Sequence, residues 1–158
     1  MNRLDAPRPG PTLPRSPFPA WAAFLLTLPG RALLTNRRRT FESCGIRPGH
    51  TVLELGAGPG FWTGELSDLL GPNGRLYAQE VQPAMLARLE RAIARRRHRG
   101  IVAPLLASSD DLPLEDASVD VVFAAFVFEE IEAEGLADAT AAELARVVKE
   151  GGALGFRE

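Results

Sequence analysis

The chain has 158 residues, a net charge of -2, 46% hydrophobic residues and 24% charged residues. This length suits one well-cored domain, and the near-balanced charge argues against a disordered protein or one that coats nucleic acid. Cys44 is the only cysteine, so an intrachain disulfide and a multi-cysteine metal site are excluded; we expect no metal and a cytoplasmic location. The longest apolar stretch, residues 20–28, is shorter than the ~20 residues of a membrane span, so no integral membrane segment is expected.

The first 45 residues differ from the rest of the chain. Six prolines lie between residues 7 and 19, a density that predicts an extended and partly mobile arm over residues 1–19. Residues 20–45 follow a helical pattern in two pieces that meet at Pro29-Gly30, and we expect them to form a helical lid. The main domain is predicted to cover residues 46–158.

Within that domain, short apolar runs alternate with amphipathic segments. This alternation predicts an α/β fold, a doubly wound Rossmann-like parallel sheet with helices on both faces. The predicted strands cover residues 51–55, 75–79, 101–106, 119–125 and 153–156. The predicted helices cover residues 61–70, the segment from Pro83 to the arginine run before Gly100, and residues 137–148, the last closed by Gly151-Gly152.

The strongest local signal is a glycine-rich turn after the first predicted strand. The segment Gly56-Ala57-Gly58-Pro59-Gly60 leads from that strand into a helix. Glycines let the backbone turn sharply and admit a ligand closer than a Cβ atom would permit, although a tight turn without any ligand is the alternative. Glu54 would repel a pyrophosphate but suits an ammonium group, and the Gly-x-Gly-x-Gly spacing differs from that of dinucleotide folds.

A carboxylate at the end of the second strand adds to this signal. Glu80 follows Gly60 by 20 residues, close to the ~20-residue offset at which an acidic residue meets ribose hydroxyls. A carboxylate there can accept two hydrogen bonds from the vicinal diol. Alone it would be taken for a solvated acid at a strand end, but with the glycine loop it favours a nucleoside ligand.

Five motifs in one order resemble the class I S-adenosylmethionine-dependent methyltransferases, and within that class the ubiquinone/menaquinone-biosynthesis-type (methyltransferase type 11-like) family. The similarity covers roughly residues 46–156, and five ordered motifs are more specific than any one of them. The motifs are Glu54–Thr63, Arg75–Met85, Asp111–Leu114, Val119–Val122 and Glu143–Gly152.

The resemblance implies that S-adenosyl-L-methionine is the cofactor. Glu54 and the Gly56–Gly60 loop, chiefly Gly56 and Gly58, would hold its methionine end, and Glu80 would hold the ribose. The resemblance places the adenine near a second group of residues: Val81, Gln82, Ser108, Ser109 and Asp110. The family often has an acidic residue at the position of Ser108, so this chain departs from the pattern there.

The reaction expected from this resemblance is an in-line methyl transfer. Phe126, just past the fourth strand, should lie near the sulfonium and the acceptor, since ligands gather at the carboxyl ends of parallel strands. Glu129 and Glu130 are candidate catalytic bases, with solvated loop acids as an equally acceptable interpretation. The protein would mainly supply alignment and water exclusion.

The predicted acceptor is a small apolar or aromatic molecule, and nucleic acid is not expected. No Asn/Asp-Pro-Pro-Tyr-type motif follows the fourth strand, and residues 126–128 would offer apolar walls. The run Arg95–Arg99 is favoured as a solvated helix end, because cations suit that end of the helix dipole.

This family normally continues with two further strands after the fifth, so the sheet is expected to lack its last antiparallel strands. Either the chain is a truncated or minimal form, or its edge strand, residues 153–156, is covered by another chain, as in a homodimer, or by the N-terminal arm. Two other functions stay open: a catalytically silent homologue that binds S-adenosylmethionine, and an NAD(P)-dependent oxidoreductase. The oxidoreductase is the weaker of the two, since Tyr77 lies inside a strand and Lys149 is remote from it in sequence.

Overall fold

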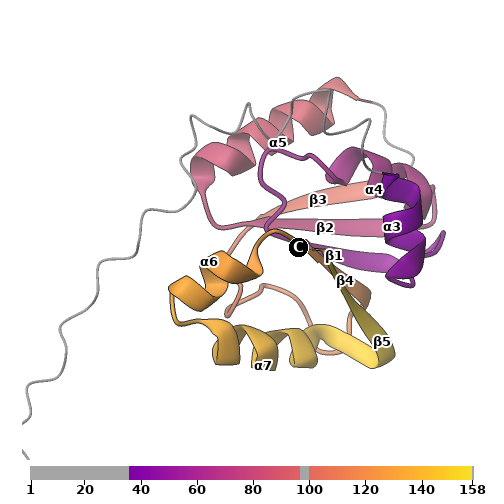
Figure 1. The fold of residues 1–158 in the computed structure, drawn as a ribbon. Coiled ribbons are helices and arrows are strands. Elements are labelled where there is room, and N and C mark those ends of the chain that lie inside the picture. Colours follow the sequence, from indigo (N-terminus) through magenta and orange to yellow (C-terminus); the bar gives the residue numbers. More distant parts are fainter. Residues whose placement is uncertain (1–35, 97–99, 158) are drawn as a thin grey trace, which may run out of the picture.

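A single parallel sheet forms the centre of the protein. The computed structural model describes residues 36–96 and 100–157, so the predicted arm and residues 20–35 of the predicted lid lie outside the described residues. Five strands pair in the order β3-β2-β1-β4-β5, each parallel to its neighbour (Figure 1). The strands are β1 (Thr51–Leu55), β2 (Arg75–Glu80), β3 (Ile101–Leu106), β4 (Val119–Ala125) and β5 (Val148–Arg157). The predicted α/β Rossmann-like fold is confirmed.

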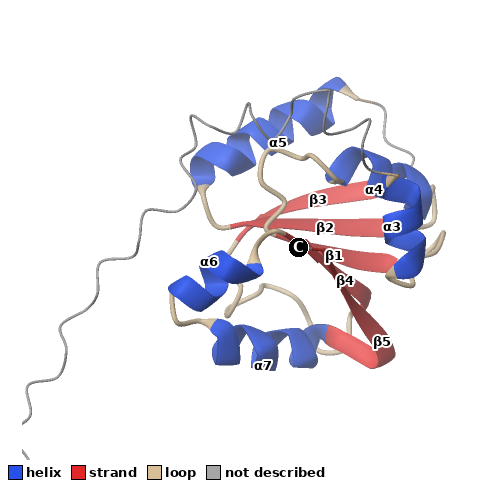
Figure 2. Ribbon diagram, in the orientation of Figure 1, coloured by secondary structure: helices blue, strands red, loops and turns tan. Residues whose placement is uncertain are grey.

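Helices cover both faces of this sheet, as Figure 2 shows. On one face lie α3 (Arg37–Ser43), α4 (Thr63–Leu70) and α5 (Pro83–Arg95), and on the other lie α6 (Phe128–Ala133) and α7 (Ala137–Val147). Parallel sheets need such cover because their crossover connections leave apolar side chains on both faces. No helix in the described ranges is long and apolar enough to cross a membrane.

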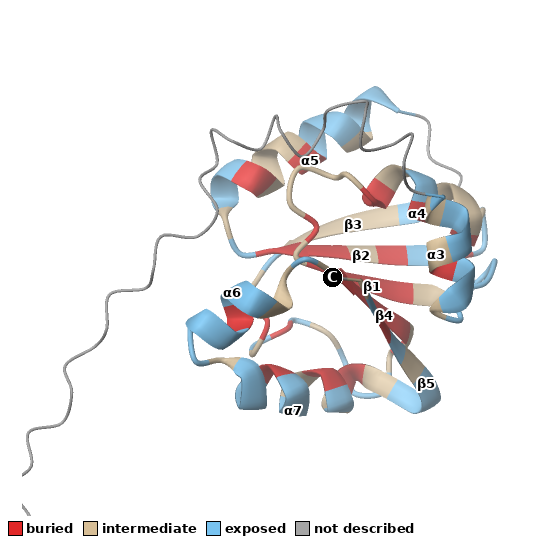
Figure 3. Ribbon diagram, in the orientation of Figure 1, coloured by how far each residue is buried: buried red, intermediate tan, exposed pale blue. Residues whose placement is uncertain are grey.

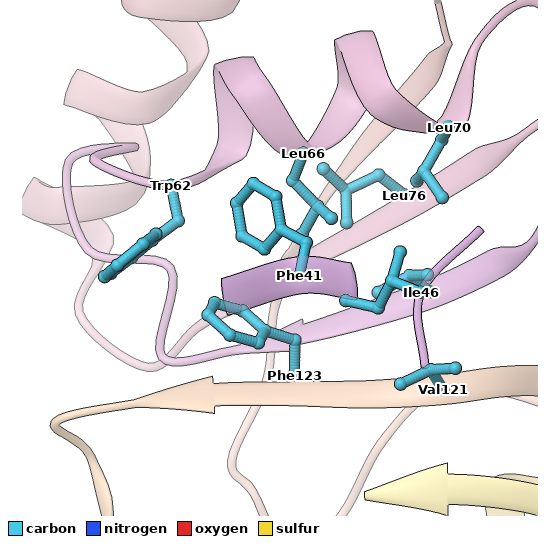
Figure 4. Close-up of a cluster of buried hydrophobic side chains, with 9 residues drawn as sticks. Phe41, Ile46, Trp62, Leu66, Leu70, Leu76, Val121 and Phe123 are labelled. Carbon is cyan, nitrogen blue, oxygen red and sulfur yellow. The ribbon is translucent and has the colours of Figure 1, made fainter. Parts of the chain in front are cut away.

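The first face is packed around three aromatic rings (Figure 4). Phe41 of α3 meets Trp62 and Phe123 edge-on, with ring centroids 5.8 and 5.3 Å apart, a favourable geometry for aromatic pairs. Phe41 is only 1% exposed, so α3 is part of the core. This contact fixes the described end of the predicted lid segment against the sheet.

The second face is built mainly on the two central strands. Leu53, Leu55 and Val122 pack against Ile131 of α6 and Leu144 of α7. Figure 3 shows β1 and β4 as the most deeply buried strands. By contrast, no residue of β3 is fully buried, because the whole connection 107–118, all of it described, holds no helix to cover this strand.

Several boundaries differ from the sequence-based expectation: β2 ends at Glu80 instead of residue 79, and β5 covers Val148–Arg157 instead of residues 153–156. The helix expected from Phe61 begins at Thr63, and α6 was not predicted. The pair Gly151-Gly152 was expected to close a helix, but α7 ends at Val147 and the pair lies inside β5, where the pairing with β4 shifts register. Gly151 has a φ of +76°, so it provides the left-handed turn that the shift requires.

Arg146 on α7 binds the connection between β3 and β4. Its guanidinium donates to the carbonyl oxygens of Leu112 and Leu114 at 3.1 and 2.8 Å and forms ion pairs with Glu143 and Asp116. The Arg146 guanidinium and the Leu112 N–H lower the pKa of Glu143 to about 2. One arginine therefore holds in place the segment that follows the predicted adenine-side residues.

We expect Arg146→Ala to lower the thermal unfolding midpoint by several degrees at pH 7, because the two carbonyls lose their partner. The pKa of Glu143 is depressed, so its contribution is present above about pH 4.5 and is lost as the pH falls toward 2. The gap between wild type and variant should therefore shrink in thermal melts at pH 3. Arg91→Ala, on the exposed side of α5, serves as the control; an equal effect there would contradict the role of Arg146.

Candidate functional site

A cavity of about 640 Å³ opens at the carboxyl ends of the strands. It spans the point between β1 and β4 where the strand order reverses, which is the usual ligand position in open α/β sheets. Most of the predicted site residues line it: Gly56, Ala57, Gly58, Glu80, Val81, Gln82, Ser108, Ser109, Phe126 and Glu130. Four predicted residues do not: Glu54, Gly60, Asp110 and Glu129.

The three glycines of the loop all have positive φ, at +67°, +56° and +95° for Gly56, Gly58 and Gly60. A Cβ on Gly56 would lie 2.7 Å from Val127 Cγ2, and one on Gly60 would lie 2.9 Å from Leu89 Cδ1. Gly58 is different: no atom lies within 4 Å of its Cβ position. Gly56 and Gly60 therefore serve packing as well as the turn, whereas Gly58 leaves open space beside the cavity for a ligand.

The loop and the second strand meet directly at Glu80. The Gly58 N–H donates to Glu80 Oε2 at 2.9 Å, and the Gln82 N–H donates to Oε1 at 2.8 Å. Glu80 is only 6% exposed; burial raises its pKa, while these backbone N–H groups act in the opposite direction. The two features singled out in the sequence thus lie side by side, with the carboxylate orientation fixed before any ligand binds.

Sequence reasoning missed Gln79, which braces the same loop. Its side-chain Oε1 accepts from the Gly56 N–H at 2.9 Å, its Nε2 donates to the Ala107 carbonyl at 2.6 Å, and its own carbonyl accepts from the Ala57 N–H at 2.8 Å. One side chain therefore ties together the segments that follow β1 and β3. The glutamine that directly follows the run Leu76–Ala78 was the signal for it, since a buried amide needs partners.

Glu54 lies under the loop and is 2% exposed. Its Oε2 accepts the Thr63 hydroxyl at 2.7 Å, whereas Oε1 is buried without a partner among the described residues. Burial raises the pKa of Glu54 to about 8, with the Thr63 hydrogen bond acting in the opposite direction. A buried carboxyl with one vacant oxygen suits a cationic group above it, because an ammonium would restore the missing partner.

The predicted adenine-side residues separate into two groups. Ser108 lines the cavity and donates its hydroxyl to the Asp110 carboxylate. Ser109 is buried and shares a 2.7 Å hydrogen bond with Thr140 of α7, so its hydroxyl already has a structural partner. Val81 and Gln82 lie at the rim of the cavity after β2.

Phe126 is held in a strained conformation at the tip of β4. Its φ is +57°, which a bulky L-residue rarely adopts, and its side chain is 51% exposed beside the cavity. Its N–H donates to the Arg157 carbonyl at 3.0 Å. Such strain at a binding site is usually retained for function, so the position of this ring is a second indication of where a ligand lies.

We expect Phe126→Asn to separate stability from activity. Asparagine tolerates positive φ, so the free energy of unfolding should rise by up to ~1 kcal/mol, while methyl transfer should fall at least about tenfold because the ring is lost. Urea melts and an initial-rate assay measure the two effects. Phe128→Asn on α6 is the control, since Phe128 has no left-handed conformation to relieve. A variant that loses both stability and activity would show that Phe126 serves packing alone.

Glu129 and Glu130 both lie in the first turn of α6, where acidic side chains suit the helix dipole. Of these two residues, only Glu130 lines the cavity.

The arginine run lies at the end of α5. Arg95 is the last residue of this helix, and Arg96 forms an ion pair with Asp68 of α4; residues 97–99 lie outside the described ranges. The described arginines of the run thus lie at a helix end, and one of them is paired with an acidic residue of the protein.

Residues 52–152 match the model of a known family, described as a methyltransferase domain. The chain belongs to this family. It is 34% identical over 116 residues to the ubiquinone/menaquinone biosynthesis C-methyltransferase UbiE of Cupriavidus necator, a match that covers 72% of this chain and 44% of that protein. The corresponding protein of Burkholderia cenocepacia is 35% identical over 116 residues with the same coverage. The chain thus spans less than half the length of these curated relatives.

Solved structures agree with the family. A crystal structure of a SAM-dependent methyltransferase from Aquifex aeolicus matches with a TM-score of 0.77 and 30% identity, over 84% of this chain and 69% of that one. A Haloferax volcanii putative methyltransferase, solved in complex with the Trm112 methyltransferase activator, matches with a TM-score of 0.65 and 26% identity, over 85% and 55%. The predicted family, fold class and cofactor class are confirmed, while the roles of single residues remain predictions.

Proposed function

We propose that this methyltransferase domain binds S-adenosylmethionine across the tips of β1 and β2 and transfers its methyl group to a small apolar or aromatic acceptor. The observation that carries the proposal is the contact between the glycine loop and Glu80, with Gly58 N–H and Glu80 Oε2 2.9 Å apart. A nucleoside with an amino-acid tail needs both features within reach of one molecule.

The residues present fit the cofactor at both ends. Open space beside Gly58 admits the methionine end, and the vacant Oε1 of Glu54 suits its ammonium, directly or through water. Glu80 has the oxygens to accept the ribose hydroxyls, while Val81 and Gln82 flank the position proposed for adenine. The bound cofactor supplies a methyl group already activated by sulfonium, and the chain supplies alignment.

The acceptor would occupy the side of the cavity nearest β4 and β5. Phe61, Trp62 and Phe126 line the cavity with aromatic side chains, which supports an apolar or aromatic acceptor. Of the two candidate bases, Glu130 lines the cavity and Glu129 does not. The atom that receives the methyl group is not part of the proposal.

A homodimer is included in the proposal because β5 is an edge strand. Leu154 and Phe156 on it are 49% and 62% exposed, and an open edge presents backbone groups that another strand can pair with. Sedimentation velocity at several protein concentrations tests this part. A purely monomeric species at high concentration would contradict it.

Calorimetric titration with S-adenosylmethionine and with NADH tests the cofactor proposal. We expect binding of the first and none of the second; Lys149 is engaged at the far end of the sheet by Asp120, 2.7 Å away, which leaves no tyrosine-lysine pair for nicotinamide chemistry. Turnover is then tested with methyl-labelled cofactor across quinol, phenol and lipid acceptors. Cofactor binding without turnover of any of them would favour the catalytically silent homologue.

A further inference from the structure

Arg157 is a cavity residue that the cofactor proposal does not use. It ends β5 and lies in register with Ala125 of β4, and its carbonyl accepts the Phe126 N–H at 3.0 Å. Its side chain reaches toward α3, where Nη1 lies 3.5 Å from Thr40 Oγ1, at the limit of a hydrogen bond. The Arg157 backbone thus lies beside Phe126, and among the described residues its guanidinium has one weak hydrogen bond, to Thr40.

The carboxyl groups of Glu80, Glu130 and Glu134 line the same cavity as Arg157, but none of them forms an ion pair with its guanidinium. Among residues 36–96 and 100–157, no carboxylate forms an ion pair with it, whereas Arg37, Arg96 and Arg146 all have one. Arg157 is also the only arginine or lysine of the described chain that lines the cavity. A guanidinium that lines a cavity and has no ion-pair partner among the described residues can bind an oxyanion through two parallel hydrogen bonds.

The position of Arg157 favours the acceptor over the cofactor as the source of that oxyanion. Glu80 ends β2 and Arg157 ends β5, and β1 and β4 lie between them. Since neighbouring strands are ~4.8 Å apart, the two residues are separated by roughly 14 Å across the sheet. A nucleoside held at β1 and β2 therefore leaves the β5 end of the cavity to the second substrate.

We propose that Arg157 binds a carboxylate or phosphate carried by the methyl acceptor, whose apolar or aromatic body packs on Phe126. The inference rests on the proposed function, since it assigns the acceptor to the same cavity. It narrows the acceptor from apolar molecules in general to those with an anionic group at one end.

Binding of matched probes tests this inference. The protein, saturated with S-adenosylhomocysteine, is titrated with 2-naphthoate, 2-naphthyl phosphate and the neutral 2-naphthamide. Wild type should bind at least one of the two anions ten or more times more tightly than the amide. Arg157→Gln should abolish that preference, and Arg157→Lys should keep part of it, because lysine retains the charge but not the paired donors. Arg75→Gln, at the opposite end of β2, has the same change in charge and should leave the preference intact.

Three results would overturn the inference. Equal affinity of wild type for the amide and both anions would show that the cavity does not select an anion, and an unchanged preference in Arg157→Gln would assign it elsewhere. A tenfold loss of S-adenosylhomocysteine affinity in Arg157→Gln, with the anion preference intact, would assign Arg157 to the cofactor carboxylate. If wild type binds no S-adenosylhomocysteine, the proposed function fails separately, and the probe titration of the unliganded protein still decides whether Arg157 selects an anion.

Discussion

Replacing Glu80 by alanine is expected to weaken binding of S-adenosylhomocysteine at least about 100-fold. Hydrogen bonds to a charged group contribute ~1.5–3 kcal/mol each, and the vicinal hydroxyls would make two of them with this carboxylate. The carboxylate is held in place before binding by the Gly58 and Gln82 N–H groups, so little of this energy goes into ordering it. Isothermal titration calorimetry measures the loss.

Comparing two ligands, with and without a ribose hydroxyl, shows whether Glu80→Ala loses a contact to the ribose or only disturbs the glycine loop. Wild type should bind the 2′-deoxy analogue of S-adenosylhomocysteine about tenfold more weakly than the parent compound, whereas Glu80→Ala should bind the two alike. Glu90→Ala, an exposed acid on α5, controls for the change in charge. If the deoxy analogue loses as much affinity in Glu80→Ala as in wild type, Glu80 does not contact the ribose.

Cofactor affinity is expected to rise with pH in wild type because of Glu54. Burial raises the pKa of this carboxyl to about 8, so in the unliganded protein it is protonated at pH 6–7.5. A cationic ammonium placed on it would draw the proton off, and affinity should then increase up to about tenfold per pH unit over that range. Titrations at pH 7 in buffers of different ionisation enthalpy should show about one proton released on binding.

Glu54→Gln should bind the cofactor more weakly at pH 7.5 and release no proton. Thr63→Val, which removes the Glu54 hydrogen bond but keeps the carboxyl, should retain proton release. Binding by wild type without proton release would mean that the Glu54 carboxyl stays neutral and does not meet the ammonium.

The Glu54 carboxyl should also make the unliganded protein less stable as the pH rises. Its pKa is about 8 when folded and 4.5 as the reference value, so the folded state holds a proton that the unfolded state has lost between these two pH values. Unfolding free energy should therefore decrease as the pH rises from about 4.5 to 8, by at most ~1.4 kcal/mol per pH unit, and stay level above. Urea melts of Glu54→Gln should lack this slope.

The sheet and the part of the cavity formed by the glycine loop and Glu80 were predictable because their signals are local. β1 and β4 have the predicted bounds, since an apolar run buried inside a parallel sheet is visible in the sequence itself. The glycine loop and Glu80 were predictable for a related reason: their spacing along the chain follows from one strand-helix-strand unit. The sequence predicted that Gly58 and Glu80 lie close together, but it did not predict the hydrogen bond between them.

The missed features depend on contacts between distant segments. Gln79 and Arg157 act through partners 28 and 117 residues away, namely Ala107 and Thr40, which no local pattern relates to them. The short helix α6 begins at Phe128, and its N-cap residue Val127 makes no side-chain capping hydrogen bond, so the usual start signal is missing. Gly151-Gly152 resembles a helix end in the sequence because the register shift within β5 also needs a left-handed residue.

A crystal structure with S-adenosylhomocysteine tests the central claim most directly. It should show the ribose hydroxyls within hydrogen-bond distance of both Glu80 oxygens, the amino-acid end above Gly58 with its ammonium directed toward Glu54, and the sulfur facing Phe126. Density for the nucleoside in the apolar groove between α7 and β5, or anywhere out of reach of Glu80, would contradict the account.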